Sequence, residues 1–475
     1  MFSRLATLVA AVPLLVAPTM SVAAAEPTPT PSPTTTPASD TAPAGAAIAT
    51  PLHTDGKRLR DATGRDVILR GINLGHKSAP YLPDVSDADL ARIRSLGLNQ
   101  LRLYTSWQAV MPSRGQVDTA YLARFRSLID RAGAAGLLVT VDMHQDLYGK
   151  PAGNGAPLWA YQPGLCPQLP LAQLTGAWGA DYFSPAVDCA FTSFWTSKDL
   201  QARFADAWVA VARAVGDAPN VIGYDLFNEP FPGLLPPVVF ETTYLFPSQA
   251  RWLAAIRTVD PDAVGFIEPN VIKSETVVEV PPVGLMPPNS VYAPHLYGPW
   301  DLTSDIPLLE KTRILADAAV ASSRLAAGLA KVPLWIGEWG VFSGAGGASD
   351  FVTHVYAMAD DALAGAALWE YTDPGYGPFR ADGGPTPIRD AVRRPYPQAV
   401  PGTLRTIDYA PATRRLTVSW VDAPAGTASL QVPAGVYPEG IAVAGASDWS
   451  WDPATGLLTA AVVPGGGTLT VTPLG

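Results

Sequence analysis

The chain has 475 residues, which is enough for a large core and more than one domain. Its composition is 48% hydrophobic and only 16% charged, which excludes a wholly disordered protein. The formal net charge of −10 argues against nucleic acid as a partner, because no basic stripe is available to neutralise phosphates.

The first residues predict a segment for export from the cell. Arg4 gives a positive start, residues 5–17 form an apolar core, and residues 23–25 are small enough for cleavage, so we expect a signal peptide over residues 1–25. An uncleaved membrane anchor is the alternative. Residues 26–47 consist almost entirely of Pro, Thr, Ser and Ala, which predicts an extended linker. The expected location is therefore extracellular, either secreted or tethered to the cell surface.

The chain contains two cysteines, Cys166 and Cys189, in one long insertion. In an exported protein they predict a disulfide, since closing such a loop restricts the unfolded chain. Two cysteines without paired histidines nearby do not supply a metal ligand set.

Residues 48–394 alternate between apolar strand candidates and helical stretches. Eight strands are predicted, over residues 67–74, 100–105, 137–144, 221–228, 263–269, 291–296, 332–337 and 365–371. Helical periodicity is clear over residues 87–95, 122–135, 200–215, 249–259, 310–330 and 351–362, and Ser86 is a candidate N-cap for the first of these helices. This alternation predicts an α/β fold, a (β/α)8 barrel of the TIM type.

Residues 395–475 follow a different pattern, with short alternating runs separated by Pro and Gly turns. Strands are expected over residues 404–409, 415–420, 429–432, 457–462 and 468–472, which predicts an all-β sandwich. A carbohydrate-binding module is the alternative, because Trp420, Trp449 and Trp451 can stack on sugars; aromatic residues in small sandwiches more often belong to the core.

Two glutamates carry most of the functional information. Glu229 lies in Asn228-Glu229-Pro230 after the fourth predicted strand, and Glu338 lies in Gly337-Glu338-Trp339 at the end of the seventh. The carboxyl ends of the strands are where such a barrel places its chemistry. Two carboxylates that face one sugar are what cleavage of a glycosidic bond needs, so we expect Glu229 to be the acid/base and Glu338 the nucleophile.

Polar residues at other strand ends are candidates for the same site. His144 and Asp146 end the third strand, and His144 can donate to a sugar hydroxyl, hold a carboxylate or belong to the core. His295 and Tyr297 end the sixth strand, where Tyr297 can hydrogen-bond the nucleophile or only pack. Asn228, beside the acid, can reach a sugar 2-hydroxyl.

Arg102 places a charge inside an apolar strand, and burying it unpaired is prohibitive, so a carboxylate partner is expected. Glu338 and an acid on another strand are the alternatives. Trp369, at the end of the eighth strand, is either the floor beneath the reacting sugar or a core tryptophan. No Gly-rich phosphate loop, His-x-x-x-His pair or serine nucleophile elbow is present, so neither a metal nor a cofactor is expected.

Together these residues resemble glycoside hydrolase family 5, whose two glutamates stand on strands four and seven. Within that family, residues 142–148, residues 73–77 and the β domain look like those of endoglycoceramidases, which cut between an oligosaccharide and ceramide. The resemblance implies that Lys77, Asp146 and Asn228 contact sugar. It also leaves open a preference for galactosylceramide-type glycolipids.

The loop after Glu229 carries much apolar surface, notably in Phe231, Leu234, Leu235, Phe240 and Phe246. Apolar side chains at a barrel mouth are expected to be shielded from water. Either they pack into the barrel core, or the lipid chains of a substrate lie along them.

The sequence therefore predicts a retaining glycoside hydrolase that acts on glycosphingolipids, works as a monomer and contacts a membrane or micelle transiently. A secreted β-glucanase, mannanase or β-glucosidase is the first alternative. A non-catalytic carbohydrate-binding protein is the second.

Overall fold

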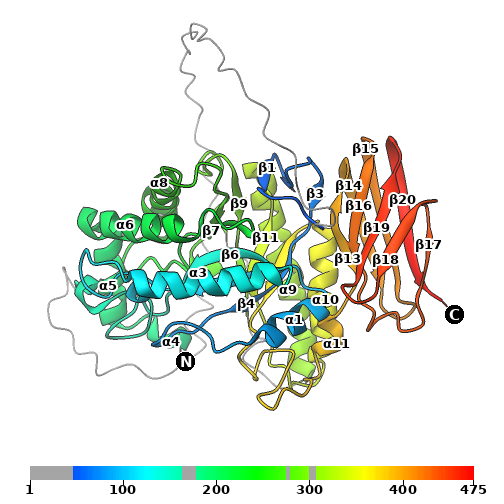
Figure 1. The fold of residues 1–475 in the computed structure, drawn as a ribbon. Coiled ribbons are helices and arrows are strands. Elements are labelled where there is room, and N and C mark those ends of the chain that lie inside the picture. Colours follow the sequence, from blue (N-terminus) through cyan, green and yellow to red (C-terminus); the bar gives the residue numbers. More distant parts are fainter. Residues whose placement is uncertain (1–46, 163–177, 274–278, 299–305, 475) are drawn as a thin grey trace, which may run out of the picture. The chain divides into compact units, whose positions relative to one another are not determined.

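The computed structural model describes residues 47–162, 178–273, 279–298 and 306–474 (Figure 1). The predicted signal peptide and all but the last residue of the linker lie outside these residues. Across the described ranges, no helix combines the length and the apolar character that a membrane span requires.

The central sheet is parallel and carries the predicted strands. In sequence order these are β4 (Arg70–Leu74), β5 (Gln100–Thr105), β6 (Leu138–Met143), β7 (Val221–Asp225), β8 (Gly265–Ile267), β9 (Ser290–Tyr292), β10 (His295–Leu296), β11 (Trp335–Trp339) and β12 (Gly365–Leu368).

The sheet closes into a ring because β9 and β10 form one interrupted strand. Tyr292 pairs with β8 on one side and bridges Leu334 on the other, and β10 then pairs with β11. Its eight strand positions confirm the predicted (β/α)8 barrel.

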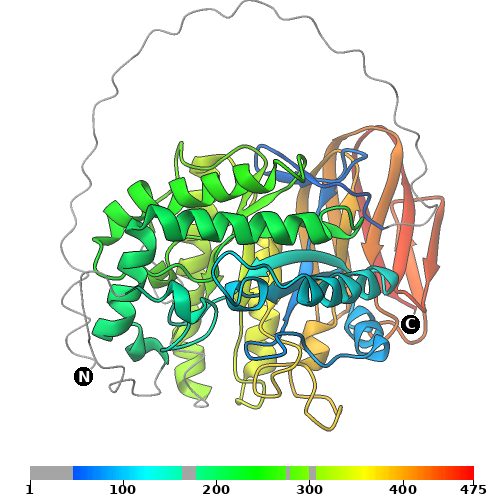
Figure 2. The same cartoon turned by 60° about the vertical axis from the view of Figure 1, so that its left-hand side comes forward.

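All six predicted helices are present, with ends shifted by a few residues. They are α1 (Asp87–Ser95), α3 (Thr119–Ala134), α6 (Lys198–Val215), α8 (Phe246–Ile256), α9 (Ile306–Ala330) and α10 (Ala348–Asp361). Ser86 caps α1 in a capping box with Asp89, as its side-chain chemistry predicts. The green helices α6 and α8 lie side by side on the outside of the sheet (Figure 2).

The other helical segments lie in the connections between these elements. These are α2 (Trp107–Val110), η2 (Leu158–Ala160), α4 (Trp178–Asp181), α5 (Pro185–Thr196), α7 (Pro237–Val239), η3 (Phe240–Leu245), η4 (Val271–Lys273) and α11 (Arg389–Val392). The segment η3 is a π-helix, a rare form that often lies near functional sites.

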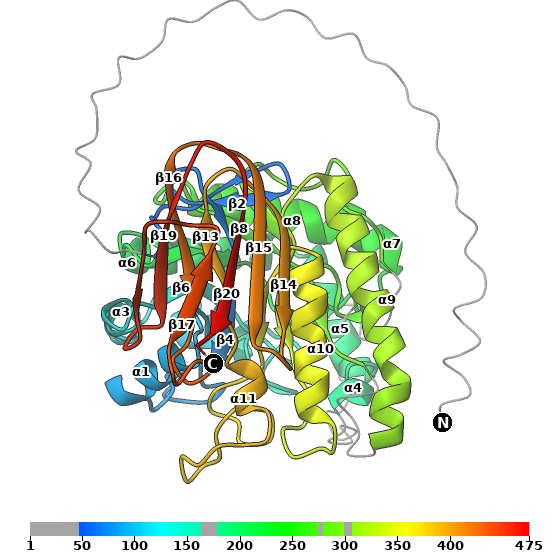
Figure 3. The ribbon, with the colours of Figure 1, turned by 90° about the vertical axis from the view of Figure 1, so that its right-hand side faces the viewer.

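The C-terminal residues form the predicted β-sandwich (Figure 3). One antiparallel sheet contains, in order, β1 (His53–Asp55), β2 (Arg58–Arg60), β3 (Asp66–Val67), β13 (Tyr396–Val400), β16 (Gly426–Gln431), β19 (Leu457–Val462) and β18 (Trp449–Asp452). The other contains β14 (Thr403–Ala410), β15 (Arg415–Ala423), β20 (Gly465–Pro473) and β17 (Ile441–Ala444).

The three tryptophans of the sandwich have different surroundings. Trp420 is buried in the core between the sheets, and Trp451 donates its indole N–H to the carbonyl of Val432. Trp449 is 39% exposed. Trp420 therefore does not face solvent, where a sugar could stack on it.

The described part of the long insertion is held by an aromatic cluster. Phe194 of α5 is fully buried, and its ring centroid lies 5.5 Å from that of Phe204 and 5.3 Å from that of Phe227. Cys189 is buried in the same helix. Cys166 lies outside the described residues, so the disulfide stays a prediction.

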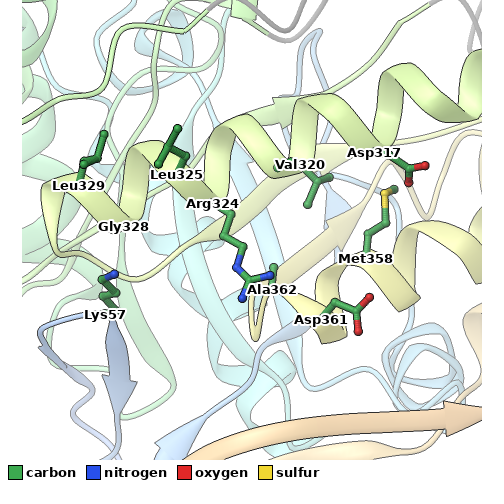
Figure 4. Close-up of a pocket in the computed structure, with 11 residues that line it drawn as sticks. Lys57, Asp317, Val320, Arg324, Leu325, Gly328, Leu329, Met358, Asp361 and Ala362 are labelled. Atoms are coloured by element: carbon green, nitrogen blue, oxygen red, sulfur yellow. The ribbon is translucent and has the colours of Figure 1, made fainter.

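A groove of about 570 Å³ runs between α9 and α10 (Figure 4). Its walls carry Leu325 and Leu329 together with the charged residues Lys57, Asp317 and Arg324. None of its lining residues follows the carboxyl end of a barrel strand, so this groove is separate from the two glutamates.

Replacing Phe194 by alanine is expected to cost about 3 to 5 kcal/mol of stability, because the cavity would be enclosed by aromatic rings that cannot collapse into it. Urea unfolding of the two proteins measures this difference. Phe183→Ala, in the same insertion but 61% exposed, is the control and is expected to cost less than about 1 kcal/mol. Equal losses in the two variants would contradict the anchoring role of Phe194.

Candidate active site

Glu229 and Glu338 lie together at the carboxyl ends of the barrel strands. Both are buried. One carboxylate oxygen of each lies within 4.8 Å of the other and of a ring nitrogen of His295. Glu338 is part of β11, and Glu229 follows β7 with a positive φ of 45°. Such a conformation is strained for a side chain other than glycine and must be held by its surroundings. The amide of Glu229 donates to Glu268 Oε2 at 2.8 Å.

The carboxylate of Glu338 is held by two donors. Tyr297 donates its hydroxyl to Oε1 at 2.9 Å, and Arg102 donates Nη1 to Oε2 at 3.0 Å. Burial raises the pKa of Glu338 above its ordinary value, and the charge of Glu229 acts in the same direction, while His295 and Arg102 oppose the rise. An ionised Glu338 therefore depends on these donors.

His295 connects Glu229 to a third carboxylate. Its Nδ1 lies 3.0 Å from Glu229 Oε1, and its Nε2 lies 3.2 Å from Glu268 Oε1. Burial alone would lower the pKa of His295, but Glu268, Glu338 and the contact with Glu229 raise it well above 6.5. The ring is therefore an imidazolium that fixes the Glu229 side chain.

Arg102 is the centre of the site's charge network and is completely buried. Its guanidinium donates to five side chains, namely Asp225 (2.8 Å), Asn228 (2.9 Å), Asn73, Glu268 and Glu338 (each 3.0 Å). Asp142 Oδ1 lies 3.2 Å from Nη2. The sequence left two possible partners for Arg102, Glu338 or an acid of another strand. The structure shows both kinds of partner at once.

A polar cluster is formed by residues that follow β4, β6 and β12. Lys77 Nζ is 2.8 Å from Asp146 Oδ2 and 4.6 Å from the centroid of the Trp369 ring. The ring of His144 stacks on Trp369 at 5.6 Å, and its Nδ1 lies 2.9 Å from Asp142 Oδ2. Burial and Lys77 lower the pKa of His144 well below 6.5, so its ring is neutral. His144 thus holds a carboxylate, one of the roles open from the sequence.

Asn228 is turned into the network rather than left free. Its Oδ1 accepts from Arg102, and its Nδ2 donates to the carbonyl of Gln145 at 3.0 Å. The predicted contact with a sugar hydroxyl would use the second N–H of this amide.

Sequence reasoning did not single out four further residues of this site: Asp225, Glu268, Tyr104 and Glu370. Glu268 ends the fifth strand in the same way that Glu338 ends the seventh, and burial raises its pKa to about 8. Asp225 is a charged residue inside an apolar strand, as Arg102 is, so the same pattern could have identified it. Tyr104 donates to Glu370 Oε2 at 2.9 Å, and burial raises the pKa of Glu370 to about 7.

The prediction that Phe231, Phe240 and Phe246 line a lipid groove is wrong. They are at most 2% exposed and belong to the barrel core. Phe240 begins η3 and Phe246 begins α8, and these two helical segments turn both rings inward, which a loop interpretation could not show. Phe231 is buried in the irregular segment that follows Glu229. Leu235 is half-buried against the same core, whereas Leu234 is 57% exposed.

Other apolar side chains of this region are exposed to solvent. Val238 and Val239 of α7 are 55% and 47% exposed, and Phe183 of the insertion is 61% exposed against Phe231. With Leu234 they form what we call the apolar rim. Leu234 is tied to the insertion by its amide, which donates to Thr192.

Comparison with known proteins assigns the family. The family described as Cellulase (glycosyl hydrolase family 5) matches residues 60–375, and the Glycoside hydrolase family 5 C-terminal domain matches residues 394–471. The chain belongs to glycoside hydrolase family 5.

Within this family the chain is similar to endoglycoceramidases. It is 32% identical to endoglycoceramidase I of Rhodococcus hoagii (strain 103S) over 74% of this chain and 73% of that protein. Endo-glycoceramidase II from Rhodococcus sp., solved as a complex with ganglioside GM3, is 32% identical with a TM-score of 0.76, covering 89% of this chain and all of that one. An endogalactoceramidase structure is 26% identical, with a TM-score of 0.72 over 89% of this chain and 99% of that one.

Tyr297→Phe is expected to move the acidic limb of the kcat/KM profile to higher pH. The lost hydrogen bond favours the ionised form of Glu338, so its removal raises the pKa of Glu338 further, and this carboxylate is protonated at a higher pH. We also expect kcat/KM at the optimum to fall by roughly 10 to 100-fold. The pH dependence of aryl β-glycoside hydrolysis measures both effects.

Tyr437→Phe is the control, because its hydroxyl donates to the carbonyl of Arg414 in the sandwich. Its profile should coincide with that of the unmodified protein. A limb that moves to lower pH in Tyr297→Phe would contradict the assignment of the donor.

Proposed function

We propose that this family 5 hydrolase cleaves the β-glycosidic bond between the oligosaccharide and the ceramide of glycosphingolipids, with retention of configuration. The observation that carries the proposal is the pair of buried carboxylates, Glu229 and Glu338, whose oxygens lie within 4.8 Å. Retaining enzymes hold such groups about 5 to 5.5 Å apart, whereas inverting enzymes leave room for a water at about 6.5 to 9.5 Å.

The reaction proceeds in two displacements. Glu338 attacks the anomeric carbon and forms a glycosyl ester, while Glu229 gives its proton to the departing ceramide oxygen. Glu229 then takes a proton from water, the water oxygen attacks the same carbon, and the ester bond to Glu338 breaks. Arg102 and Tyr297 hold the carboxylate that attacks and later leaves.

Sugar recognition rests on the polar cluster of Lys77, Asp146, His144 and Trp369. The Trp369 ring offers a flat face for the sugar, and Lys77 and Asp146 offer a donor and acceptors beside it. The half-buried Lys77 shares Asp146 Oδ2 with Asn154, which donates to that atom at 2.8 Å and fixes the carboxylate in place. A rigid acceptor of this kind discriminates between sugar hydroxyl orientations.

The lipid part of the substrate is expected to lie along the apolar rim. Leu234, Val238 and Val239 belong to the segment that follows Glu229, and Phe183 packs against Phe231 of the same segment. Acyl and sphingoid chains would remove this surface from water at roughly 25 cal/mol per Å² of apolar area. The similarity to endoglycoceramidases supports the same substrate class.

Substrate class is tested with a panel of lactosylceramide, galactosylceramide-type glycolipids, cello-oligosaccharides and manno-oligosaccharides. We expect mass spectrometry to find intact oligosaccharide plus free ceramide, with the β anomer formed first by NMR. Glu338→Gln should abolish turnover and Glu338→Asp should leave a trace. Faster cleavage of cello- or manno-oligosaccharides than of any glycolipid would establish a polysaccharide-degrading enzyme instead.

Val238→Asp with Val239→Asp is expected to lower kcat/KM for micellar lactosylceramide by about tenfold or more, since charged residues repel the lipid chains. Hydrolysis of a soluble aryl lactoside should not change, because the polar cluster is untouched. Leu325→Asp in α9, at a position that is 62% exposed, is the matched control and should leave both rates unchanged. Equal losses on both substrates would contradict the rim's role in lipid binding.

Export from the cell is part of the same proposal. It rests on the N-terminal sequence pattern, and fractionation of cells that produce the full chain tests it.

A further inference from the structure

A second pocket lies where α10 and α11 meet the sandwich. It encloses about 310 Å³ and is lined by residues of both domains, namely Thr353, Asp390, Ala391, Arg393, Arg394, Tyr409, Pro411, Arg414, Gly435, Val436 and Pro438. Figure 3 shows the yellow helix α10 beside β14, the strand that carries Tyr409. We call this pocket the arginine pocket.

Positive charge is concentrated around this pocket. Arg70 and Arg394 share the single carboxylate of Asp360, and Arg389 and Arg393 share that of Asp390. Arg414 hydrogen-bonds only the carbonyl of Val436, in the described part of the chain. Five guanidinium groups thus face two carboxylates, in a protein whose net charge is −10.

The arginines also retain unused hydrogen-bond donors. The Nε atoms of Arg393 and Arg394 are buried without an acceptor among the described residues. The closest acid to Arg393 is Asp390, 3.9 Å from Nη1, which is an ion pair without a hydrogen bond. Buried donors of this type are costly when they are left unsatisfied.

Aromatic rings compensate this charge only in part. Arg394 lies 5.1 Å from the centroid of Tyr409 and 5.4 Å from that of Tyr356. A cation above a ring gains less than a guanidinium fork gains from a carboxylate, sulfate or phosphate, which satisfies two N–H donors at once.

We propose that the arginine pocket binds an oxyanion, a carboxylate, sulfate or phosphate group, with Arg393 and Arg414 as its direct donors. Arg393 follows α11 of the barrel, and Arg414 lies in the turn between β14 and β15 of the sandwich. One anion bound by both arginines ties the two domains together. This inference does not depend on the proposed glycosidase specificity.

The test compares thermal unfolding of the full protein in sodium sulfate and in sodium chloride at matched ionic strength. We expect sulfate to raise the unfolding temperature saturably, because a ligand that binds only the folded state stabilises it. In Arg414→Gln and Arg393→Gln the half-saturating sulfate concentration should rise by about tenfold or more. Arg414 is exposed, so its replacement leaves the core intact, and aryl glycoside turnover checks the fold.

Arg124→Gln, an exposed position of α3 outside the pocket, is the matched control and should respond to sulfate like the unmodified protein. No saturable rise in the unmodified protein, or an equal rise in all variants, would overturn the proposal.

Vesicles identify the source of the anion. If phosphatidylglycerol vesicles bind the unmodified protein but not Arg414→Gln, while phosphatidylcholine vesicles bind neither, the oxyanion belongs to a lipid head group. If vesicle binding is the same in both proteins and only the sulfate response differs, the pocket takes a free anion.

Discussion

One buried arginine sets the conditions for the whole catalytic centre. Arg102 lies at the centre of four carboxylates, from Asp142, Asp225, Glu268 and Glu338, and has no exposure to water. Desolvation makes each of these charges expensive, and only mutual pairing offsets that cost. Arg102 and the His295 imidazolium supply too little positive charge for all the acids around them to ionise. Some carboxyls therefore hold protons, as the raised pKa values of Asp142 and Glu268 indicate.

This charge arrangement depends on the register of the barrel strands. Arg102 pairs with Asn73 on one side and Thr140 on the other, which places it below the layer that holds Asp142 and Asp225. His295 and Glu338 are direct neighbours across β10 and β11. A slip of one residue in any of these strands would turn its polar side chain away from the barrel interior. The catalytic geometry is thus a property of the backbone pairing as much as of the side chains.

The sequence identified what local patterns encode and missed what distant segments decide. Apolar runs located all eight strand positions, and the strand-end signal located Glu229, Glu338 and Tyr297. The partners of Arg102 could not be chosen, because the pattern says that a residue points inward but not which distant acid meets it. The sequence also did not show which face of α7 and η3 turns toward the core. Phe240 was therefore expected at the surface, where the structure has Val238. Strands as short as β1, β2 and β3 leave no periodic signal at all.

Those three short strands change the relation between the two domains. β3 precedes the first barrel strand and pairs with β13, which follows the last barrel helix, so both ends of the barrel are fixed within one sheet of the sandwich. Arg58 and Asp66 each hydrogen-bond the backbone of Leu404. Separating the domains would therefore break sheet hydrogen bonds and expose the core beneath β13, rather than open a flexible joint. The sandwich thus holds the two ends of the barrel together, and the arginine pocket lies at the contact between these two domains.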